Sequence, residues 1–450
     1  MSSLNRRKFL TLSATIGAGV FAAPAILRAQ SPSKKLNLAI IGASGKGGDN
    51  LGKFLDHNIV ALCDVDVNGI NKAKEQIEKK QGTAFSGKTY QDYRKLYDDL
   101  KDYDAVVIST PDHHHFPATI RALAQKKHVY CEKPLTHTIW EAREIAKLAK
   151  AAGVATQMGN QGNASEDIRL TTEWIQAGVI GPVKEVHCWS NRPIWPQGIT
   201  WPEQASGPVP ENLNWDLWLG PAADRPYYNE CHPFKWRGFW DFGTGAFGDM
   251  GCHILNWPYT ALELGQPIAA ECISEEGATK DSPPKRSTIR LDFAAKGDRP
   301  AVTMYWHDGG NLPTAEQFGG EIFKREGDDK VTQNGSLFIG EKGRLLDDYD
   351  RGGPTLLPKE KMADFKAPEK RLPRSKDHHK EWITAIEGGE RAGSDFVAKS
   401  AGLTEMVLIG HLAARVGPGK KIDWDSETGT AKNVPEAAKW VNKEYRPGWI

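Results

Sequence analysis

A glycine-rich segment near the start of the chain has the spacing of a dinucleotide-binding turn. Gly42-Ala43-Ser44-Gly45-Lys46-Gly47 follows an apolar run and precedes a helical pattern, close to G-x-G-x-x-G with Ser44 at the second glycine. The first glycine permits the tight turn, and small residues let backbone N–H groups approach a pyrophosphate at the helix N-terminus. Asp64 ends the next apolar run, where an acid binds the adenosine ribose. These residues predict bound NAD, and NADP stays possible because Lys46 could offset the repulsion between Asp64 and a 2′-phosphate.

Lys133, Asp249 and His253 are of the types that suit oxidation of an alcohol. Loss of a hydride from a C–H group requires removal of the O–H proton, and an imidazole titrates near neutral pH. A cation near the reacting oxygen stabilises the developing alkoxide. Asp249 and His253 stand four residues apart, so a helix would place them on one face. A surface lysine, a helix-terminal aspartate and a core histidine are the alternative interpretations.

Two further motifs, taken with the glycine turn, resemble the glucose–fructose oxidoreductase/inositol dehydrogenase/MocA (Gfo/Idh/MocA) family. Thr110-Pro111-Asp112-His113-His114-His115 follows the third predicted strand, and Glu132-Lys133-Pro134 follows the fourth. The resemblance implies that Lys133 contacts the reacting hydroxyl, that His253 is the general acid/base, and that Asp249 orients it or binds a substrate hydroxyl. It also implies that the cofactor pocket includes Thr110, Pro111, His115, Glu132 and Lys133.

Alternating strand and helix patterns must position these motifs. From 35 to 157 they predict an NAD(P)-binding Rossmann domain, a doubly wound parallel sheet. The predicted strands are 36–41, 59–63, 105–109, 128–131 and 154–158, and the predicted helices are 68–80, 117–126 and 138–152.

The pattern changes after the predicted Rossmann domain. Residues 158–416 predict a substrate-binding and oligomerisation α+β domain with a large, mostly antiparallel sheet, because its strand-like runs lack long helices between them. These runs are 269–274, 287–293, 301–306 and 336–339, and helices are predicted at 377–387 and 398–415. Residues 417–450 are predicted to be a tail that packs on the body. The fold class is therefore α/β.

Tryptophan is concentrated in the region expected to bind substrate. Nine of the fifteen tryptophans lie between 174 and 257. Apolar sugar faces stack on aromatic rings, whereas sugar hydroxyls need polar partners. Trp195, Trp201, Trp236 and Trp240 are the candidate platform, and each of them could equally pack inside the second domain. The candidate polar partners are Asn160, Gln161, Arg192 and Arg237.

Composition and the remaining motifs exclude several classes of protein. A formal charge of +1 with 26% charged residues provides no basic field for nucleic acid. No metal site is predicted at His113-His114-His115, because neighbours in an extended or turning segment cannot all face one ion. Cys231-His232 and Cys252-His253 are likewise interpreted as pocket wall or core. The six cysteines show no C-x-x-C pattern and indicate no disulfide framework.

The first thirty residues predict export. Asn5-Arg6-Arg7-Lys8-Phe9-Leu10 is a twin-arginine pattern, an apolar run covers 12–25, and Leu27-Arg28-Ala29 offers a cleavage site. Residues 1–30 are therefore predicted to be a twin-arginine signal peptide, with the mature protein periplasmic and without a stable membrane anchor. The segment Trp215–Met250 resembles an exported branch of the family.

The leading hypothesis is an NAD(P)-dependent oxidoreductase acting on a hydroxyl of a sugar, polyol or glycoside. Free NAD is scarce outside the cytoplasm, so the cofactor is expected to stay bound and to recover its redox state within each turnover. A redox-assisted glycoside hydrolase, lyase or epimerase is the first alternative, and a non-catalytic sugar-binding protein is the second. The family resemblance also implies a homodimer or homotetramer.

Overall fold

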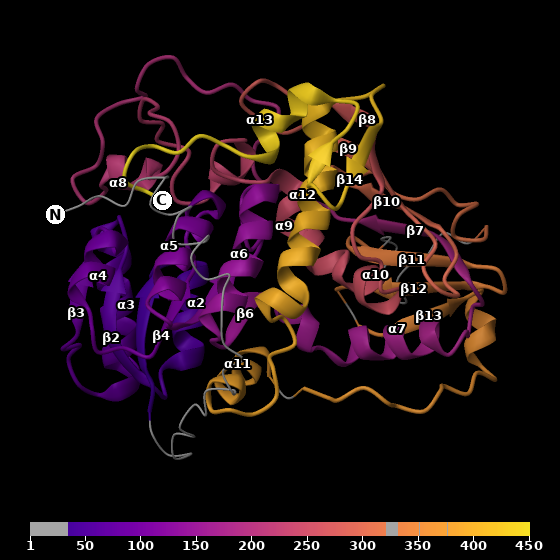
Figure 1. The fold of residues 1–450 in the computed structure, drawn as a ribbon, viewed down its shortest axis with the longest axis horizontal. Coiled ribbons are helices and arrows are strands. Elements are labelled where there is room, and N and C mark those ends of the chain that lie inside the picture. Colours follow the sequence, from indigo (N-terminus) through magenta and orange to yellow (C-terminus); the bar gives the residue numbers. More distant parts are fainter. Residues whose placement is uncertain (1–34, 321–331, 351, 376) are drawn as a thin grey trace, which may run out of the picture.

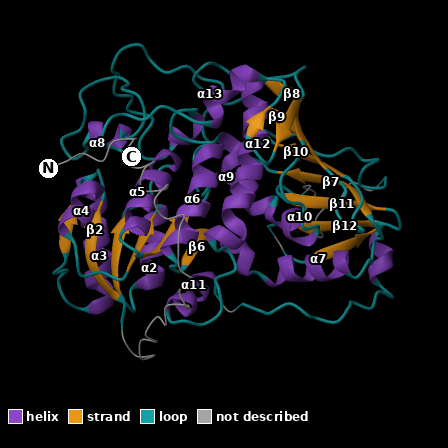
Figure 2. Cartoon of the chain, viewed as in Figure 1, coloured by secondary structure: helices purple, strands orange, loops and turns teal. Residues whose placement is uncertain are grey.

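The computed structural model describes residues 35–320, 332–350, 352–375 and 377–450, so the predicted signal peptide lies outside the described residues. The two sheets stand at opposite ends of the molecule, and helices lie between them (Figure 1). Figure 2 shows the same division, with long loops above the N-terminal sheet. No helix among the described residues combines the length and the apolar character needed to cross a bilayer.

The N-terminal unit is the predicted Rossmann fold. Its six strands are all parallel and have the order β3-β2-β1-β4-β5-β6. Strands β1, β4 and β5 are buried almost throughout because helices cover both faces of the sheet. The strands are β1 (Asn37–Ile41), β2 (Asn58–Cys63), β3 (Lys88–Tyr90), β4 (Ala105–Ile108), β5 (His128–Glu132) and β6 (Thr156–Gly159); the helices are α2 (Lys46–Phe54), α3 (Val67–Gln81), α4 (Tyr93–Asp99), α5 (Asp112–Ala124) and α6 (Ile139–Ala152).

The second unit is built on a nine-stranded sheet with the order β13-β12-β11-β7-β10-β9-β8-β14-β15. Only β7 and β10 pair in parallel, so the predicted, mostly antiparallel sheet is confirmed. The strands are β7 (Val183–Trp189), β8 (Ala269–Glu276), β9 (Arg286–Phe293), β10 (Val302–His307), β11 (Gly335–Gly340), β12 (Arg344–Asp348), β13 (Pro354–Leu357), β14 (Ile422–Asp425) and β15 (Thr430–Ala431).

The longest helix of the second unit joins the two units. Helix α12 (Ala401–Val416) is buried on nearly every side, as expected for a helix that is apolar all round. It packs on α6 of the Rossmann domain and on β8 of the second sheet. The other helices are η1 (Gln161–Ala164), α7 (Glu166–Gln176), α8 (Trp215–Leu219), η2 (Lys235–Gly238), α9 (Gly245–Ile254), α10 (Asn256–Ala261), η3 (Lys359–Met362), α11 (His378–Ile386), the π-helix η4 (Phe396–Ser400), η5 (Pro435–Ala437) and α13 (Ala438–Val441).

The C-terminal segment is more than a tail on the surface. Its strand β14 pairs with β8 and extends the nine-stranded sheet. The chain then returns to the Rossmann domain, where Trp449 packs edge-on against Tyr93 and His114. The guanidinium of Arg94 lies 3.9 Å from the Trp449 ring centroid. This return segment, residues 438–450, ties the second unit to α4 and α5.

Replacing Trp449 by alanine should destabilise the whole protein. The ring is 3% exposed, and loss of a buried tryptophan costs about 3–5 kcal/mol of unfolding free energy. The neighbouring Ile450 is 45% exposed, so Ile450→Ala should change the unfolding free energy by less than about 0.5 kcal/mol. Thermal and denaturant unfolding of both variants measure this difference, and equal effects would show that the return segment contributes little.

Candidate active site

The glycine turn adopts a conformation that larger residues could not. Gly42 has a φ of +77°, and a Cβ there would lie 2.7 Å from the Ser109 backbone. A Cβ on Gly47 would lie 1.7 Å from the carbonyl oxygen of Gly42. Helix α2 starts so close to the end of β1 that only glycine fits at both positions.

Asp64 lies against the same turn. Its Oδ2 accepts a hydrogen bond from the backbone N–H of Ala43 at 2.9 Å and from the Ser44 hydroxyl at 3.3 Å. Burial raises the pKa of Asp64, and the backbone donors Asp66 and Ala43 act in the opposite direction. The Ser44 side chain therefore turns toward Asp64, which ties β2 to the turn.

The residues around the turn fit a dinucleotide. Gly45, the N-cap residue of α2, has no side chain that could cap the helix, and of the first-turn N–H groups that of Gly47 donates to the Ser44 carbonyl oxygen, so those that remain can bind an anion. Two predicted site residues also carry buried polar atoms that have no partner among the described residues: Thr110 Oγ1 and His253 Nδ1. Buried polar atoms are normally paired, so unpaired ones just after β4 and on α9 are consistent with a ligand site.

Lys133 and Asp249 meet although they come from different units. Lys133 Nζ donates to Asp249 Oδ1 at 2.7 Å and to the Asp249 carbonyl oxygen at 2.8 Å. Both side chains are 14% exposed. Burial raises the pKa of Asp249, but the positive charges of Lys133 and Arg237 outweigh it and bring this pKa to about 2. The Asp249 carboxylate is thus ionised at neutral pH.

His253 lies one turn after Asp249 on α9, as the spacing predicts. Burial and the nearby Lys133 charge lower its pKa to about 3, and Lys46 at the start of α2 adds to the effect. The imidazole is therefore neutral and can accept a proton. Tyr349, directly after β12, places its ring 5.8 Å from the His253 ring, and no sequence signal pointed to this residue.

Asp112 is a second acid beside this group. It begins α5, and its Oδ2 accepts a hydrogen bond from Thr244 Oγ1 at 2.8 Å. Burial raises the pKa of Asp112 to about 7, while Arg237 and Lys133 act in the opposite direction. Sequence reasoning did not assign Asp112 to the site, although it lies within the recognised motif around Thr110.

His115 supports the pocket rather than lining it. Its ring nitrogens lie 2.6 Å from the carbonyl oxygen of Pro134 and 2.9 Å from that of Thr110. The ring therefore joins the loop that contains Thr110 and Pro111 to the loop that contains Lys133. The Glu132 carboxylate accepts hydrogen bonds from Asn50 and Gln161, so it is also bound within the protein.

The predicted sugar partners Asn160 and Gln161 are engaged internally. Asn160 donates to the carbonyl oxygen of Cys252 and accepts from Ser394, and it is almost fully buried. Gln161 donates to Tyr130 and Glu132. In this structure the two amides hold η1 against its neighbours, and their contact with sugar hydroxyls stays a prediction.

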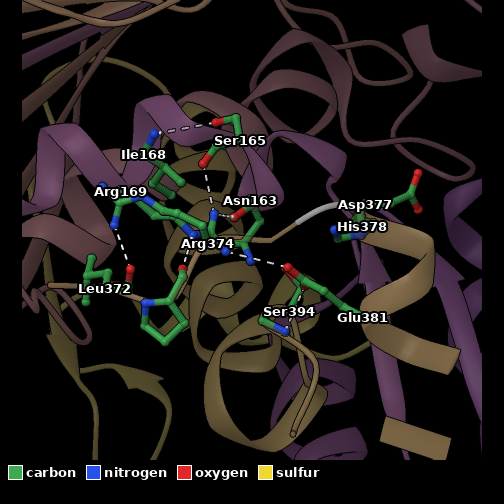
Figure 3. Close-up of polar contacts among 12 residues, drawn as sticks. Asn163, Ser165, Ile168, Arg169, Leu372, Arg374, Asp377, His378, Glu381 and Ser394 are labelled. Atoms are coloured by element: carbon green, nitrogen blue, oxygen red, sulfur yellow. Dashed lines mark hydrogen bonds and ion pairs between the residues drawn. The ribbon is translucent and has the colours of Figure 1, made fainter. Parts of the chain in front are cut away.

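Polar contacts made by charged side chains hold η1 and the start of α7 (Figure 3). Arg169 of α7 donates to the carbonyl oxygens of Asn163 and Ser165 and lies 3.5 Å from the Glu381 carboxylate of α11. Lys399 donates to Asn163 Oδ1 at 2.5 Å. Burial and the nearby Arg169 charge lower the pKa of Lys399 to about 7. Charged groups from three elements therefore fix the loop that follows β6.

The tryptophan platform is not present as predicted. Trp195, Trp201, Trp236 and Trp240 are each 5% exposed or less, and a stacking surface needs an open ring face. Trp201 packs in an aromatic cluster with Phe239 and Phe242, and Trp240 packs against His411. Composition overstated the role of these rings because a buried core and a binding surface both use tryptophan.

The three consecutive histidines lie on α5, not in the extended or turning segment expected from the sequence. His113 and His114 both face the carbonyl oxygen of Trp218, and His115 faces the two loops described above. His232 lies 3.2 Å from Asp66. The residues that the structure describes contain no group of three side chains suited to hold a metal ion.

Comparison with known proteins follows the same division into two units. Residues 36–160 match the family model described as "Oxidoreductase family, NAD-binding Rossmann fold", and residues 183–265 match "Oxidoreductase family, C-terminal alpha/beta domain". The chain is 32% identical over 93 residues to 2,7-anhydro-N-acetylneuraminate hydratase of Escherichia coli, covering 20% of this chain and 25% of the relative. It is 39% identical over 95 residues to D-xylose 1-dehydrogenase (NADP(+)) of Hypocrea jecorina, covering 21% and 23%.

Solved structures extend the similarity to the whole fold. The WlbA dehydrogenase of Chromobacterium violaceum, solved with NADH and UDP-GlcNAcA, is similar at a TM-score of 0.58 and 16% identity. The alignment covers 90% of this chain and 99% of that one. By contrast, the alignments with the two curated relatives above span about a quarter of their length.

The fold and its glycine turn define a two-domain protein with an NAD-binding Rossmann domain. Both matching family models are models of the Gfo/Idh/MocA oxidoreductase family, which this chain resembles in each of its two domains.

Buried histidines should make the protein sensitive to acid. Burial lowers the pKa of His253, His307 and His411 to about 3, whereas unfolded histidine titrates near 6.5. Between pH 6.5 and pH 3 the unfolded state binds more protons than the folded state. The unfolding free energy therefore decreases as the pH decreases, by about 1.4 kcal/mol per pH unit for each histidine. Asp112, Asp308 and Asp347, with pKa values raised to about 7, oppose this trend. The histidines outnumber them, because burial also lowers the pKa of His114 to about 3 and those of His378 and His379 to about 4.

Melting temperature should therefore decrease from pH 7 to pH 4.5, as measured by calorimetry. His411→Leu removes one titrating group without touching the site and should make the decrease shallower. A melting temperature that stays constant over this range would contradict the expectation.

Proposed function

We propose that the protein oxidises or reduces a hydroxyl carbon of a sugar, polyol or glycoside with NAD. The observation that carries this proposal is the convergence of Lys133 and His253 at Asp249, where the two domains meet. The ends of β4 and β5 bring the recognised loops to the same place. The non-catalytic alternative does not explain why a cation, a carboxylate and a neutral imidazole should be buried together.

The roles of the side chains follow from their charges. When bound, the nicotinamide accepts or returns a hydride. The neutral imidazole of His253 takes the hydroxyl proton, and the Lys133 ammonium stabilises the alkoxide as it develops. Asp249 holds Lys133 in place and favours the imidazolium that forms when His253 is protonated. Asp64 and the glycine turn hold the adenosine ribose and the pyrophosphate.

Transient oxidation within a lyase, hydrolase or epimerase cycle is the second candidate function. The hydratase and the dehydrogenase reported above are both similar to this chain, so the same scaffold accommodates both outcomes. A relative at 25% identity over 205 residues is named glycosyl hydrolase family 109 protein 1. A keto-sugar or lactone product indicates net oxidation, whereas a free aglycone indicates hydrolysis.

We further infer a periplasmic location after twin-arginine export, from Arg6 and Arg7 and the apolar run that follows them. Because NAD is scarce outside the cytoplasm, the cofactor stays bound and is recycled within each turnover. Purified protein without nicotinamide absorbance would contradict this cycle. A homodimer or homotetramer remains the expected assembly.

Asp64→Asn should weaken NAD binding about tenfold and change NADP binding much less. The carboxylate makes charge-assisted hydrogen bonds to a ribose and repels a 2′-phosphate, and the amide does neither. Titration calorimetry with both dinucleotides measures the ratio. Asp56→Asn, at an exposed aspartate, is the control. If the ratio of NAD affinity to NADP affinity is unchanged in Asp64→Asn, the adenosine ribose does not bind at Asp64.

Lys133→Met and His253→Asn should each lower kcat/KM about 10²- to 10³-fold with NAD binding preserved. Nicotinamide absorbance and mass spectrometry of products from a panel of sugars and glycosides measure the loss. Lys147→Met, at a lysine that is exposed on α6, is the matched control. Turnover that survives both site substitutions would refute the catalytic assignment.

A further inference from the structure

Three cations surround the Asp249 carboxylate. Lys133 Nζ lies 2.7 Å from Oδ1 and Arg237 Nε lies 3.5 Å from it, while Arg192 Nε lies 3.9 Å from Oδ2. Each cation comes from a different segment: Lys133 from the loop after β5, Arg192 from the loop after β7, and Arg237 from η2. A single carboxylate cannot balance three positive charges.

The other acids near this cluster do not remove the excess. Asp112 is bonded to Thr244 and lies close enough for Arg237 and Lys133 to act on it. Counting Asp112 as fully ionised still leaves one positive charge in excess, and counting it as protonated leaves two. Glu132 bonds to the neutral amides of Asn50 and Gln161 and, among the described residues, forms no ion pair with the three cations. The ion-pair cluster around Asp249 therefore carries an excess of positive charge.

The two arginines are held in position but keep donors for a ligand. The Arg237 guanidinium lies 4.2 Å from the Trp236 ring centroid and 4.8 Å from that of Phe234, and Nη1 donates to the Phe234 carbonyl. Arg192 Nη1 donates to Asn191 at 2.5 Å. Their distances from Asp249 exceed those of a charge-assisted hydrogen bond. Among the described residues, neither forms a two-point pair with a carboxylate, and their side chains are 26% and 22% exposed for Arg192 and Arg237.

We propose that the substrate is an acidic sugar whose carboxylate binds to Arg192 and Arg237. The planar guanidinium groups match a carboxylate, and one negative charge balances the excess that remains when both acids are ionised. The aromatic rings of Trp236 and Phe234 hold Arg237 so that less freedom is lost on binding. This inference rests on the proposed oxidoreductase function, and it specifies the class of sugar.

Matched substrate pairs test the proposal with the cofactor-loaded enzyme. Glucose and glucuronate, galactose and galacturonate, and glucose 6-phosphate are compared by nicotinamide absorbance and by calorimetric binding. In at least one pair, kcat/KM for the sugar acid should be higher than kcat/KM for the neutral sugar by about tenfold or more. Arg237→Gln and Arg192→Gln should reduce this preference about tenfold, mainly through KM, and Arg237→Lys should retain part of it.

Arg286→Gln, at an exposed arginine of β9 paired with Glu276, is the control and should leave the preference unchanged. Circular dichroism and NAD binding establish that each variant is folded. Better use of the neutral sugar in every pair, or calorimetric binding of none of the acids, overturns the proposal. If glucose 6-phosphate binds more strongly than the sugar acids, the proposal that the two arginines bind a carboxylate is overturned. Acid binding that depends on Arg237 without any absorbance change supports the anion site and counts against the redox function.

Discussion

The ion pair between Lys133 and Asp249 is the interaction on which the site depends. Its cation follows the fifth strand of the Rossmann sheet and its anion lies on α9 of the second domain, so the pair fixes one domain against the other. Removal of Asp249 would leave the buried Lys133 ammonium without its ion-pair partner, which costs far more than the pair contributes. Burial and the Lys133 charge keep His253 neutral, and the Asp249 charge attracts Arg192 and Arg237. The charges of the site and the relative position of the two domains therefore depend on the same ion pair.

Local spacing explains why part of the site could be predicted. The glycine turn needs small residues within six positions, and a helix brings Asp249 and His253 to one face, so both arrangements follow from short segments. The contact of Lys133 with Asp249 spans 116 residues along the chain and depends on how the domains pack. Tyr349 gave no signal, because it lies directly after a short strand that the apolar pattern did not reveal.

The fold, like the site, could be predicted where short segments determine it and not where contacts with other parts of the chain do. Regular alternation predicted the parallel sheet, and the spaced runs predicted the antiparallel one. Short elements were missed: β3 has three residues and β14 has four, and each is held by a neighbouring strand rather than by its own periodicity. The start of α5 was placed too late, at Pro117, whereas the helix begins at Asp112 and includes that proline. Tryptophan content indicated a binding surface where the structure has a core.

The contact between Tyr93 and Trp449 has a consequence for biosynthesis. The two rings pack together although they are separated by nearly the whole described chain. During translation the Rossmann segment emerges first, but α4 and α5 lack this neighbour until residue 449 has left the ribosome. The N-terminal domain can therefore collapse early, and the ring faces of Tyr93 and His114 that Trp449 covers stay open until then.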